Sequence, residues 1–314
     1  MHPRLVVIAA LALAPLRLLA ATPAQAFAGR WDVTLQTPER AYSSWLDVRQ
    51  EHGSVRVRMV GRWGHARWLP KAGIVDGHLR FVSPREEEGR SDGDMVFDAV
   101  RVGDRLAGTT TGPDGSTWTW RAERAPALAT PKAPHWGAPV TLFDGKDFSA
   151  WRALDPAAKP WQVLDGTLIS PGAGTDLRSV ARFGDFKLHL EFNSARGANS
   201  GVYLRGRYEL QIENDLVPEA PNMRTGGIYG YLAPTVAATR KPGVWQRYDI
   251  TLLGRYVSVA LNGKTVIDRK EIPGITGGAL DSDEASDGPL VLQGSEDGQV
   301  SYRNIVITPA SRQP

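Results

Sequence analysis

Three short alternating segments, at 186–193, 202–205 and 208–213, carry chemically active side chains at every second position. Because successive side chains of a β-strand point to opposite faces, each segment divides into an apolar set and a polar set. Carboxylates, imidazole, phenol, guanidinium and amide groups can bind polyols and move protons. We therefore expect the three segments to share one outward face that forms a site. Its polar residues are His189, Glu191, Tyr203, Arg205, Glu209 and Gln211.

The alternation by itself leaves a second interpretation open. A solvated sheet face with cross-strand ion pairs, each worth less than about 1 kcal/mol, has the same pattern. Glycines in and beside strands favour a site, because they often mark bends or the close approach of a ligand. The glycines in question are Gly197, Gly201, Gly206, Gly226, Gly227 and Gly230.

The elements that position these residues belong to a long region of strands and turns, at 139–314. The apolar partners of the polar set are expected to form its core, among them Phe186, Leu188, Val202, Leu204 and Leu210. No long stretch has the helical period, and Asn262-Gly263 is a strong hairpin signal. One large β-sandwich is the economical interpretation.

Residues 27–125 are also predicted to be all-β, as a separate domain. Short alternating segments are divided by turn signals such as Asp76-Gly77 and Pro113-Asp114-Gly115. This pattern is typical of a small antiparallel barrel or sandwich with one solvated face. Residues 126–138, rich in proline and alanine, are expected to link the two domains.

The first 26 residues have the features of a secretory signal peptide. Arg4 supplies the positive charge, an apolar run follows, and Ala24-Gln25-Ala26 matches the small-x-small cleavage pattern. We expect cleavage after Ala26 and a periplasmic or secreted protein. The apolar run is about half the ~20 residues of a spanning helix, so no transmembrane segment is expected.

The overall composition excludes several classes of function. Loss of the leader lowers Lys+Arg from 37 to 35 against 34 acids, so the mature net charge is +1, which does not call for a nucleic acid partner. The absence of cysteine excludes disulfides, thiolate metal sites and a cysteine nucleophile. The oligomeric state is left open by the sequence.

Eight segments of the second domain occur in the order found in a known family. They are LFDGKDFSAW (142–151), WQVLDGTL (161–168), FGDFKLHLEF (183–192), NSGVYLRGRYELQI (199–212), GGIYGYLAP (226–234), PGVWQRYDI (242–250), LNGKTVID (261–268) and GPLVLQG with VSYRNI (288–305). On these segments the chain resembles, over about 139–309, the 3-keto-disaccharide hydrolase domain family. The first domain lies outside this resemblance.

The resemblance implies a concanavalin-like jelly-roll sandwich that acts on glycosides oxidised to a ketone at C3. Such chemistry needs a base for the C2 proton and donors for the enolate oxygen. We assign the base to Glu209 or, second, to Glu191, and the oxyanion donors to Arg205 and His189. The residues expected to bind an oxidised sugar or oligosaccharide are Asn199, Tyr203, Gln211, Tyr229, Gln293 and Glu296.

One stretch departs from the family pattern. Many members carry a histidine after the late Leu-Gln pair, whereas here Gln293 is followed by Gly294-Ser295-Glu296-Asp297. Either an acidic residue of this stretch replaces the histidine or the activity is altered. A non-catalytic, lectin-like carbohydrate-binding protein on the same fold is therefore the alternative function, and a structural envelope protein is the third.

No cofactor is required by these interpretations. The acidic stretch DSDEASDG (281–288) has the ligand types of a calcium site but lacks the glycine and terminal glutamate of a helix–loop–helix site. A structural calcium ion is thus one interpretation, and a solvated, mobile loop is the favoured one. No pair of histidines has zinc-ligand spacing.

Overall fold

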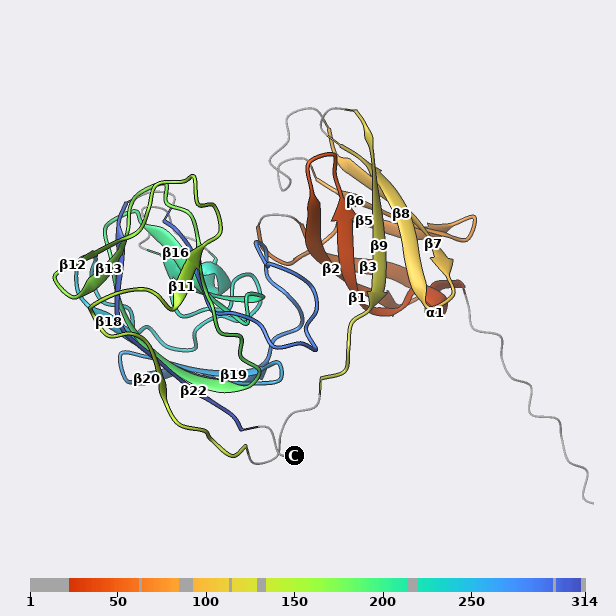
Figure 1. Cartoon of the computed structure of the whole chain (residues 1–314). Helices are drawn as coiled ribbons and strands as arrows, with labels where there is room; N and C mark the ends of the chain where they lie inside the picture. The colour runs from red at the N-terminus through yellow and green to blue at the C-terminus, as the bar shows by residue number, and fades with distance from the viewer. Residues whose placement is uncertain are drawn as a thin grey trace, which may run out of the picture.

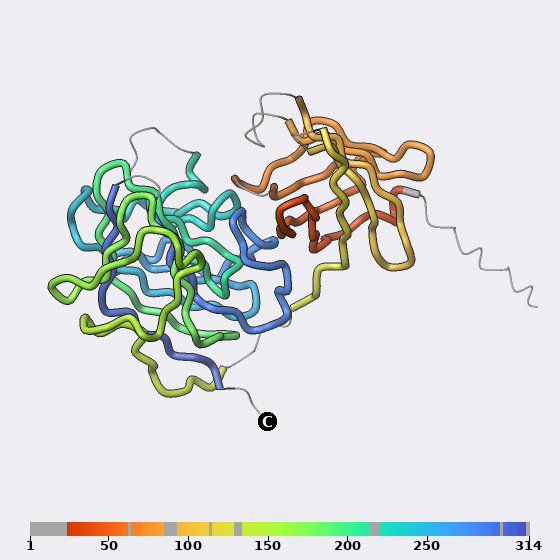
Figure 2. The backbone as a smooth tube through the Cα atoms, turned by 45° about the horizontal axis from the view of Figure 1, so that its top comes forward, coloured from red at the N-terminus to blue at the C-terminus, as the bar shows by residue number. Residues whose placement is uncertain are grey.

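The computed structural model has nearly all of its regular structure in antiparallel strands, which confirms the prediction of an all-β protein. The strands form two units that lie side by side (Figures 1 and 2). No helix in the described part of the chain is long and apolar enough to cross a membrane. Residues 1–22, most of the expected signal peptide, lie outside the described residues. The structure describes residues 23–61, 64–84, 93–112, 115–128, 134–213, 220–295 and 298–311.

The first unit is one curled antiparallel sheet in the order β4-β3-β2-β1-β9-β8-β7-β6-β5. The sheet curls so that β5 lies beside β3. Between β4 and β5, the Leu69 amide donates to the carbonyl of Val57 in β3 at 2.8 Å. Large apolar side chains, among them Trp31, Phe81 and Trp120, fill the interior. The short helix α1 (Pro23–Phe27) precedes β1. The strands are β1 (Gly29–Gln36), β2 (Ala41–Glu51), β3 (Ser54–Val60), β4 (Arg67–Trp68), β5 (Lys71–Val75), β6 (His78–Ser83), β7 (Met95–Val102), β8 (Arg105–Thr111) and β9 (Thr117–Arg124).

The second unit consists of two sheets around one core. The larger sheet has the order β12-β13-β22-β15-β18-β19-β20, with β10 also paired to β22, and the smaller has the order β11-β14-β21-β16-β17. The larger sheet contains β10 (Val140–Phe143), β12 (Gln162–Leu164), β13 (Thr167–Ser170), β15 (Phe186–Ser194), β18 (Gln246–Leu253), β19 (Tyr256–Leu261), β20 (Lys264–Glu271) and β22 (Val300–Pro309). The smaller contains β11 (Trp151–Ala153), β14 (Leu177–Ser179), β16 (Asn199–Leu204), β17 (Tyr208–Glu213) and β21 (Val291–Leu292). A single 3₁₀ turn, η2 (Pro221–Met223), follows β17 in the described chain.

The core of the second unit confirms the alternation expected from the sequence. Phe186 and Leu188 from β15 are buried together with Val202, Leu204 and Leu210 from β16 and β17. The two sheets therefore bury their facing apolar sets against each other. The finer expectation, a jelly-roll topology, stays a prediction.

The two units are held by a tight interface. Trp45, Val60 and Ala66 of the first unit pack on Ile275 of the second in a small buried cluster. Glycines permit close backbone approach there: a Cβ atom at Gly230 would lie 2.5 Å from the Cβ of His65. At Gly274 an added Cβ would collide with the Trp45 ring, and at Gly277 with the backbone of Gly64.

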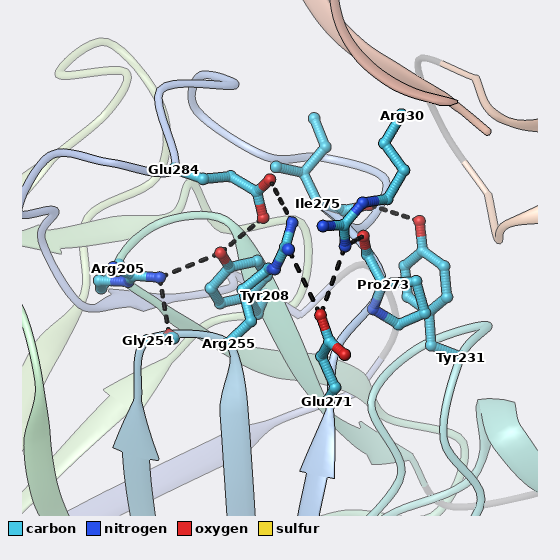
Figure 3. A network of polar contacts seen from close by, with 10 residues as sticks. All are labelled: Arg30, Arg205, Tyr208, Tyr231, Gly254, Arg255, Glu271, Pro273, Ile275 and Glu284. Carbon is cyan, nitrogen blue, oxygen red and sulfur yellow. Dashed lines mark hydrogen bonds and ion pairs between the residues drawn. The ribbon is translucent and has the colours of Figure 1, made fainter. Parts of the chain in front are cut away.

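A polar network runs beneath this interface (Figure 3). Arg255, with a side chain only 4% exposed, donates to Glu284 and to Glu271 at 3.3 Å each. Arg30 of β1 reaches across from the first unit to Glu271 at 3.5 Å and to the carbonyl of Pro273 at 3.2 Å. The network ties the first unit to the sandwich through paired charges, whose separation would leave buried charge unpaired.

The acidic stretch 281–288 is part of this network. Glu284 is fully buried and accepts a hydrogen bond from the Tyr208 hydroxyl at 2.6 Å. Asp281 accepts from the buried Arg207 guanidinium at 2.5 Å. Asp283, Ala285 and Ser286 are exposed, as expected of a solvated loop, but Glu284 is not. Composition could not predict this burial, because Tyr208 and Arg255, which pair with Glu284, are distant in the sequence. Among the described residues no group of three acidic or histidine side chains is placed to hold a metal ion.

Candidate functional site

The outward face of the smaller sheet collects polar residues in two adjacent rows. Tyr203 on β16 lies opposite Glu209 on β17, and the Tyr229 amide donates to the Glu209 carbonyl at 3.0 Å. In the next row Gly201 lies opposite Gln211, and the Gln293 amide donates to the Gly201 carbonyl at 2.9 Å. Residues that pair directly across strands share a face, so these side chains project to the same side.

Glu209 is the buried carboxylate at the centre of this face. Its side chain packs against Gly201, and a Cβ atom added to that glycine would lie 2.5 Å from Glu209 Oε1. The Tyr203 hydroxyl lies 3.0 Å from Glu209 Oε2 and 3.0 Å from the carbonyl of Gly277. The hydroxyl has one proton to donate, and a carboxylate is the stronger acceptor of the two. With the Gln211 amide turned so that its nitrogen faces the acceptors, this nitrogen donates to Glu209 Oε1 at 3.2 Å.

Burial fixes the protonation of Tyr203. Desolvation, followed by the negative charges of Glu209 and Asp176, raises the pKa of Tyr203 well above its ordinary value. The phenol therefore keeps its proton throughout the neutral range and acts as a donor. Tyr203 and Glu209 are each only 4% exposed, so this face is covered rather than wetted.

A cavity of about 320 Å³ opens beside Tyr203, and Glu209 contacts it only through the hydrogen bond to that tyrosine. Its polar lining includes Tyr203, Gln293 and Asp176. Asp176 accepts from the Gly294 amide at 2.9 Å. Gln293 lines the cavity, while its buried Oε1 has no hydrogen-bond partner within the described chain. A cavity with a few polar groups in its lining is the usual form of a ligand site.

Asp176 was missed by the sequence reasoning. It directly precedes the short strand β14, in the stretch Thr175-Asp176-Leu177-Arg178. Leu177 is buried in the core, so alternation across this stretch assigns Asp176 to the outward face. The signal was present, but three-residue strands are too short to recognise from periodicity alone.

His189 and Glu191 lie on the opposite side of the sandwich, so the expectation of one shared face for all three segments was wrong. Both residues are on β15, in the larger sheet. His189 pairs with Asp249 at 2.6 Å, and Glu191 accepts hydrogen bonds from Arg303 at 2.7 Å and Asn304 at 2.9 Å. Alternation distinguishes inside from outside, but the outward faces of two packed sheets point in opposite directions.

The Glu191 side of the sandwich has the properties of an ion-paired surface. Burial alone would raise the pKa of Glu191, but hydrogen bonds from Asn304 and Arg303 lower it. A hollow of about 370 Å³ lies beside His189 and Asp249, whose side chains are 39% and 45% exposed. Buried polar groups beside a cavity are the stronger mark of a site, which favours the Tyr203–Glu209 face.

Arg205 is also separated from Glu209. Strand β16 ends at Leu204, and Arg205 has a positive φ of 54°, so the alternation stops one residue earlier than the sequence pattern indicates. Its buried guanidinium donates to the Tyr208 hydroxyl at 3.0 Å and to the Gly254 carbonyl at 2.9 Å (Figure 3). It therefore lies with the core-facing Tyr208, whereas Glu209 faces outward.

The remaining expected binding residues are placed as follows. Asn199 begins β16 on the same outward face as Tyr203, and Gln211 is 2% exposed beside Glu209. Tyr229 is half-buried next to β17. Glu296 lies outside the described residues. The structure thus brings together Tyr203, Glu209, Gln211, Tyr229 and Gln293.

The fold and this face define a two-sheet β-sandwich with one covered polar face, and comparison with known proteins identifies the family. The sequence profile of the 3-keto-alpha-glucoside-1,2-lyase-like domain matches residues 138–308, more than half of the chain. The chain belongs to this family. The first unit lies outside the matched region.

Individual relatives are more distant. A 3-keto-disaccharide hydrolase of Bacteroides thetaiotaomicron is 25% identical over a region that covers 41% of this chain and 57% of that protein. The chain therefore spans less than two thirds of that relative. A Parabacteroides distasonis crystal structure, described as a candidate glycosyl hydrolase, is 29% identical, covers 57% of this chain and 92% of its own, and has a TM-score of 0.48. A second one from the same organism is 22% identical, covers 55% of this chain and 94% of its own, and has a TM-score of 0.47.

Proposed function

We propose that this protein cleaves glycosides whose sugar carries a ketone at C3. Membership of the 3-keto-alpha-glucoside-1,2-lyase-like family supports the substrate class. The observation that supports a site is the buried Tyr203–Glu209 pair, whose tyrosine lines a cavity together with Asp176 and Gln293.

The chemistry follows from the ketone. A C3 carbonyl acidifies the proton on C2, so a base can remove it and leave an enolate. The electron pair of the enolate then expels the C1 substituent, whose oxygen takes up a proton. Addition of water to the new C1–C2 double bond, hydroxyl at C1 and hydrogen at C2, gives net hydrolysis. The step needs one base and donors to the oxyanion.

Glu209 is our proposed base and Tyr203 the neighbouring donor. A phenol that retains its proton can hold the carboxylate in place, or give its hydrogen bond to the developing enolate oxygen. Asn199, Gln211 and Gln293 are proposed to orient the sugar hydroxyls, and Tyr229 to form an aromatic wall. Asp176 adds a second carboxylate to the proposed site. His189, Glu191 and Arg205 have no role in it, since they lie elsewhere in the fold.

The test is turnover of 3-keto-trehalose and of methyl 3-keto-glucoside by the wild type and by Glu209→Gln. General-base loss typically costs about 10²–10⁴-fold in rate, while binding should persist because the amide keeps the shape of the side chain. Glu191→Gln is the matched control, because it alters a carboxylate on the opposite sheet and should leave turnover unchanged.

Failure of the wild type to release product from either substrate would refute the proposal. Binding without turnover would instead favour the lectin-like alternative. That alternative draws support from the near-complete burial of Glu209, which a lectin tolerates more easily than a base that must meet its substrate.

We also infer export, with cleavage after Ala26 and a periplasmic or secreted location. The support is the leader pattern Arg4, apolar run and Ala24-Gln25-Ala26. Fractionation of the producing cells and N-terminal sequencing test this directly: a mature chain that begins at Phe27 outside the cytoplasm is expected. Full-length chain retained in the cytoplasm would contradict the inference.

A further inference from the structure

The cavity beside Tyr203 has walls from both units. The second unit supplies the polar floor, whereas Arg40, Ala41, Tyr42 and Ser43, at the start of β2 in the first unit, supply one wall. The first unit is not part of the matched family region, so this wall is a feature of this chain rather than of the domain alone.

Part of the lining of this cavity is apolar. Leu154 and Leu280 line it and are 38% and 36% exposed. Tyr42 adds an aromatic ring beside them, and the guanidinium of Arg40 stacks over that ring at 4.9 Å from its centroid. These three side chains and the guanidinium of Arg40 therefore line the same cavity as the polar residues of the second unit.

The wall is fixed relative to the floor. Gly230 and Gly277 let the 64–66 backbone of the first unit pack directly on the second, and Arg30 crosses to Glu271. Gly277 also connects the interface to the site, because its carbonyl lies 3.0 Å from the Tyr203 hydroxyl. A rigid wall beside a cavity can select a ligand without an ordering cost on binding.

We propose that this wall is the leaving-group subsite of the enzyme and that it selects an aromatic aglycone. The inference rests on the proposed function, in which the sugar ring is held at Tyr203, Gln293 and Asp176. The substituent expelled from C1 then points toward Tyr42, Leu154 and Leu280. A flat aromatic ring buries apolar area on the leucines and stacks on Tyr42. Arg40 attracts the negative charge that a phenolate acquires as the C1–O bond breaks.

The experiment compares phenyl 3-keto-glucoside with methyl 3-keto-glucoside in the wild type and in Tyr42→Ala. Loss of the stacking surface should lower kcat/KM for the phenyl substrate by about tenfold and leave the methyl substrate within about twofold. The matched control is Tyr256→Ala, because Tyr256 forms a similar surface pair with Arg269, at 5.6 Å, on the larger sheet. That variant should change neither substrate.

A binding arm separates this inference from the proposed function. Phenyl glucoside and methyl glucoside lack the ketone, so their Kd values can be measured by calorimetry without turnover. The wild type should prefer the phenyl compound, and Tyr42→Ala should lose that preference even if no keto-glycoside is cleaved. The inference is overturned if the wild type binds both ligands with equal Kd, or if Tyr42→Ala weakens both equally. It is also overturned if Tyr42→Ala lowers kcat/KM more for 3-keto-trehalose than for the phenyl substrate, because the wall would then bind a second sugar.

Discussion

Substitution of Asp32 by Asn should change how the stability of the protein depends on pH. Asp32 lies on β1, two residues after Arg30, and both project toward the second unit. Burial raises the pKa of Asp32 to about 8, and the negative charges of Glu284 and Asp283 act in the same direction. The positive charges of Arg255 and Arg30 lower this pKa, but by less. The buried Oδ1 of Asp32 has no hydrogen-bond partner within the described chain, which also disfavours the charged form.

The sign and size of the effect follow from proton linkage. An unfolded aspartate releases its proton near about pH 3.9, whereas the folded one retains it up to about pH 8. The folded state therefore binds more protons across this window, so stability is complete below the lower value and is lost as pH rises toward the upper one. A difference of one bound proton changes the free energy of unfolding by about 1.4 kcal/mol per pH unit. After solvent screening at this partly exposed site, we expect the wild type to lose about 1–3 kcal/mol of stability between about pH 5 and pH 7.

Urea unfolding of the wild type and of Asp32→Asn at several pH values measures this difference. Asparagine cannot ionise, so the variant should gain stability over the wild type as the pH rises. Asp98→Asn is the control with the opposite sign: burial alone would raise the pKa of Asp98, but hydrogen bonds from His78 and Arg80 lower it. Its stabilising effect is present above the unfolded pKa and lost as pH falls through the folded one. Parallel pH profiles for the wild type and Asp32→Asn would refute the reasoning.

Three further perturbations test the site and the interface. Gly201→Ala should lower turnover at least about tenfold with little change in Tm, because the new Cβ displaces the carboxylate of Glu209; unchanged kinetics would contradict this geometry. Glu284→Ala should cost about 3–5 kcal/mol in urea unfolding, since it leaves buried charge unpaired, and a loss below about 1 kcal/mol would show that the network is dispensable. Gly274→Val should separate the units by collision with Trp45, seen as a larger radius of gyration in X-ray scattering, whereas an unchanged radius would show that the interface adapts.

Much of the fold could be predicted from the sequence, because strand alternation is a local property. The segments around Val202 and Leu210 each bury the residues that their pattern assigns to the core. Turn signals such as Asp76-Gly77 lie between strands, here β5 and β6. Strands β4 and β5 have too few alternating residues to show a period, so no local pattern predicts them. The curl that returns β5 to β3 depends on pairing between distant strands, which no local pattern encodes.

The site was predicted only in part, for a related reason. Alternation correctly put Tyr203 and Glu209 on one outward face, because β16 and β17 are joined by a tight turn and must pair. It could not assign β15 to the other sheet, and so it grouped Glu191 with residues on the far side of the core. Only neighbours in a hairpin share a face by necessity.

The contribution of the first unit is harder still to foresee from sequence. Tyr42 and Gln293 are separated by most of the chain, yet both line one cavity. They meet because glycines in the second unit let the backbone of the first unit pack against them at contact distance. The sequence around a glycine does not indicate which distant segment packs on it. Those glycines have two effects: they fix the first unit and, through the Gly277 carbonyl beside Tyr203, join the interface to the polar face. A change that loosens the interface should therefore alter the chemistry of the site as well as the stability of the fold.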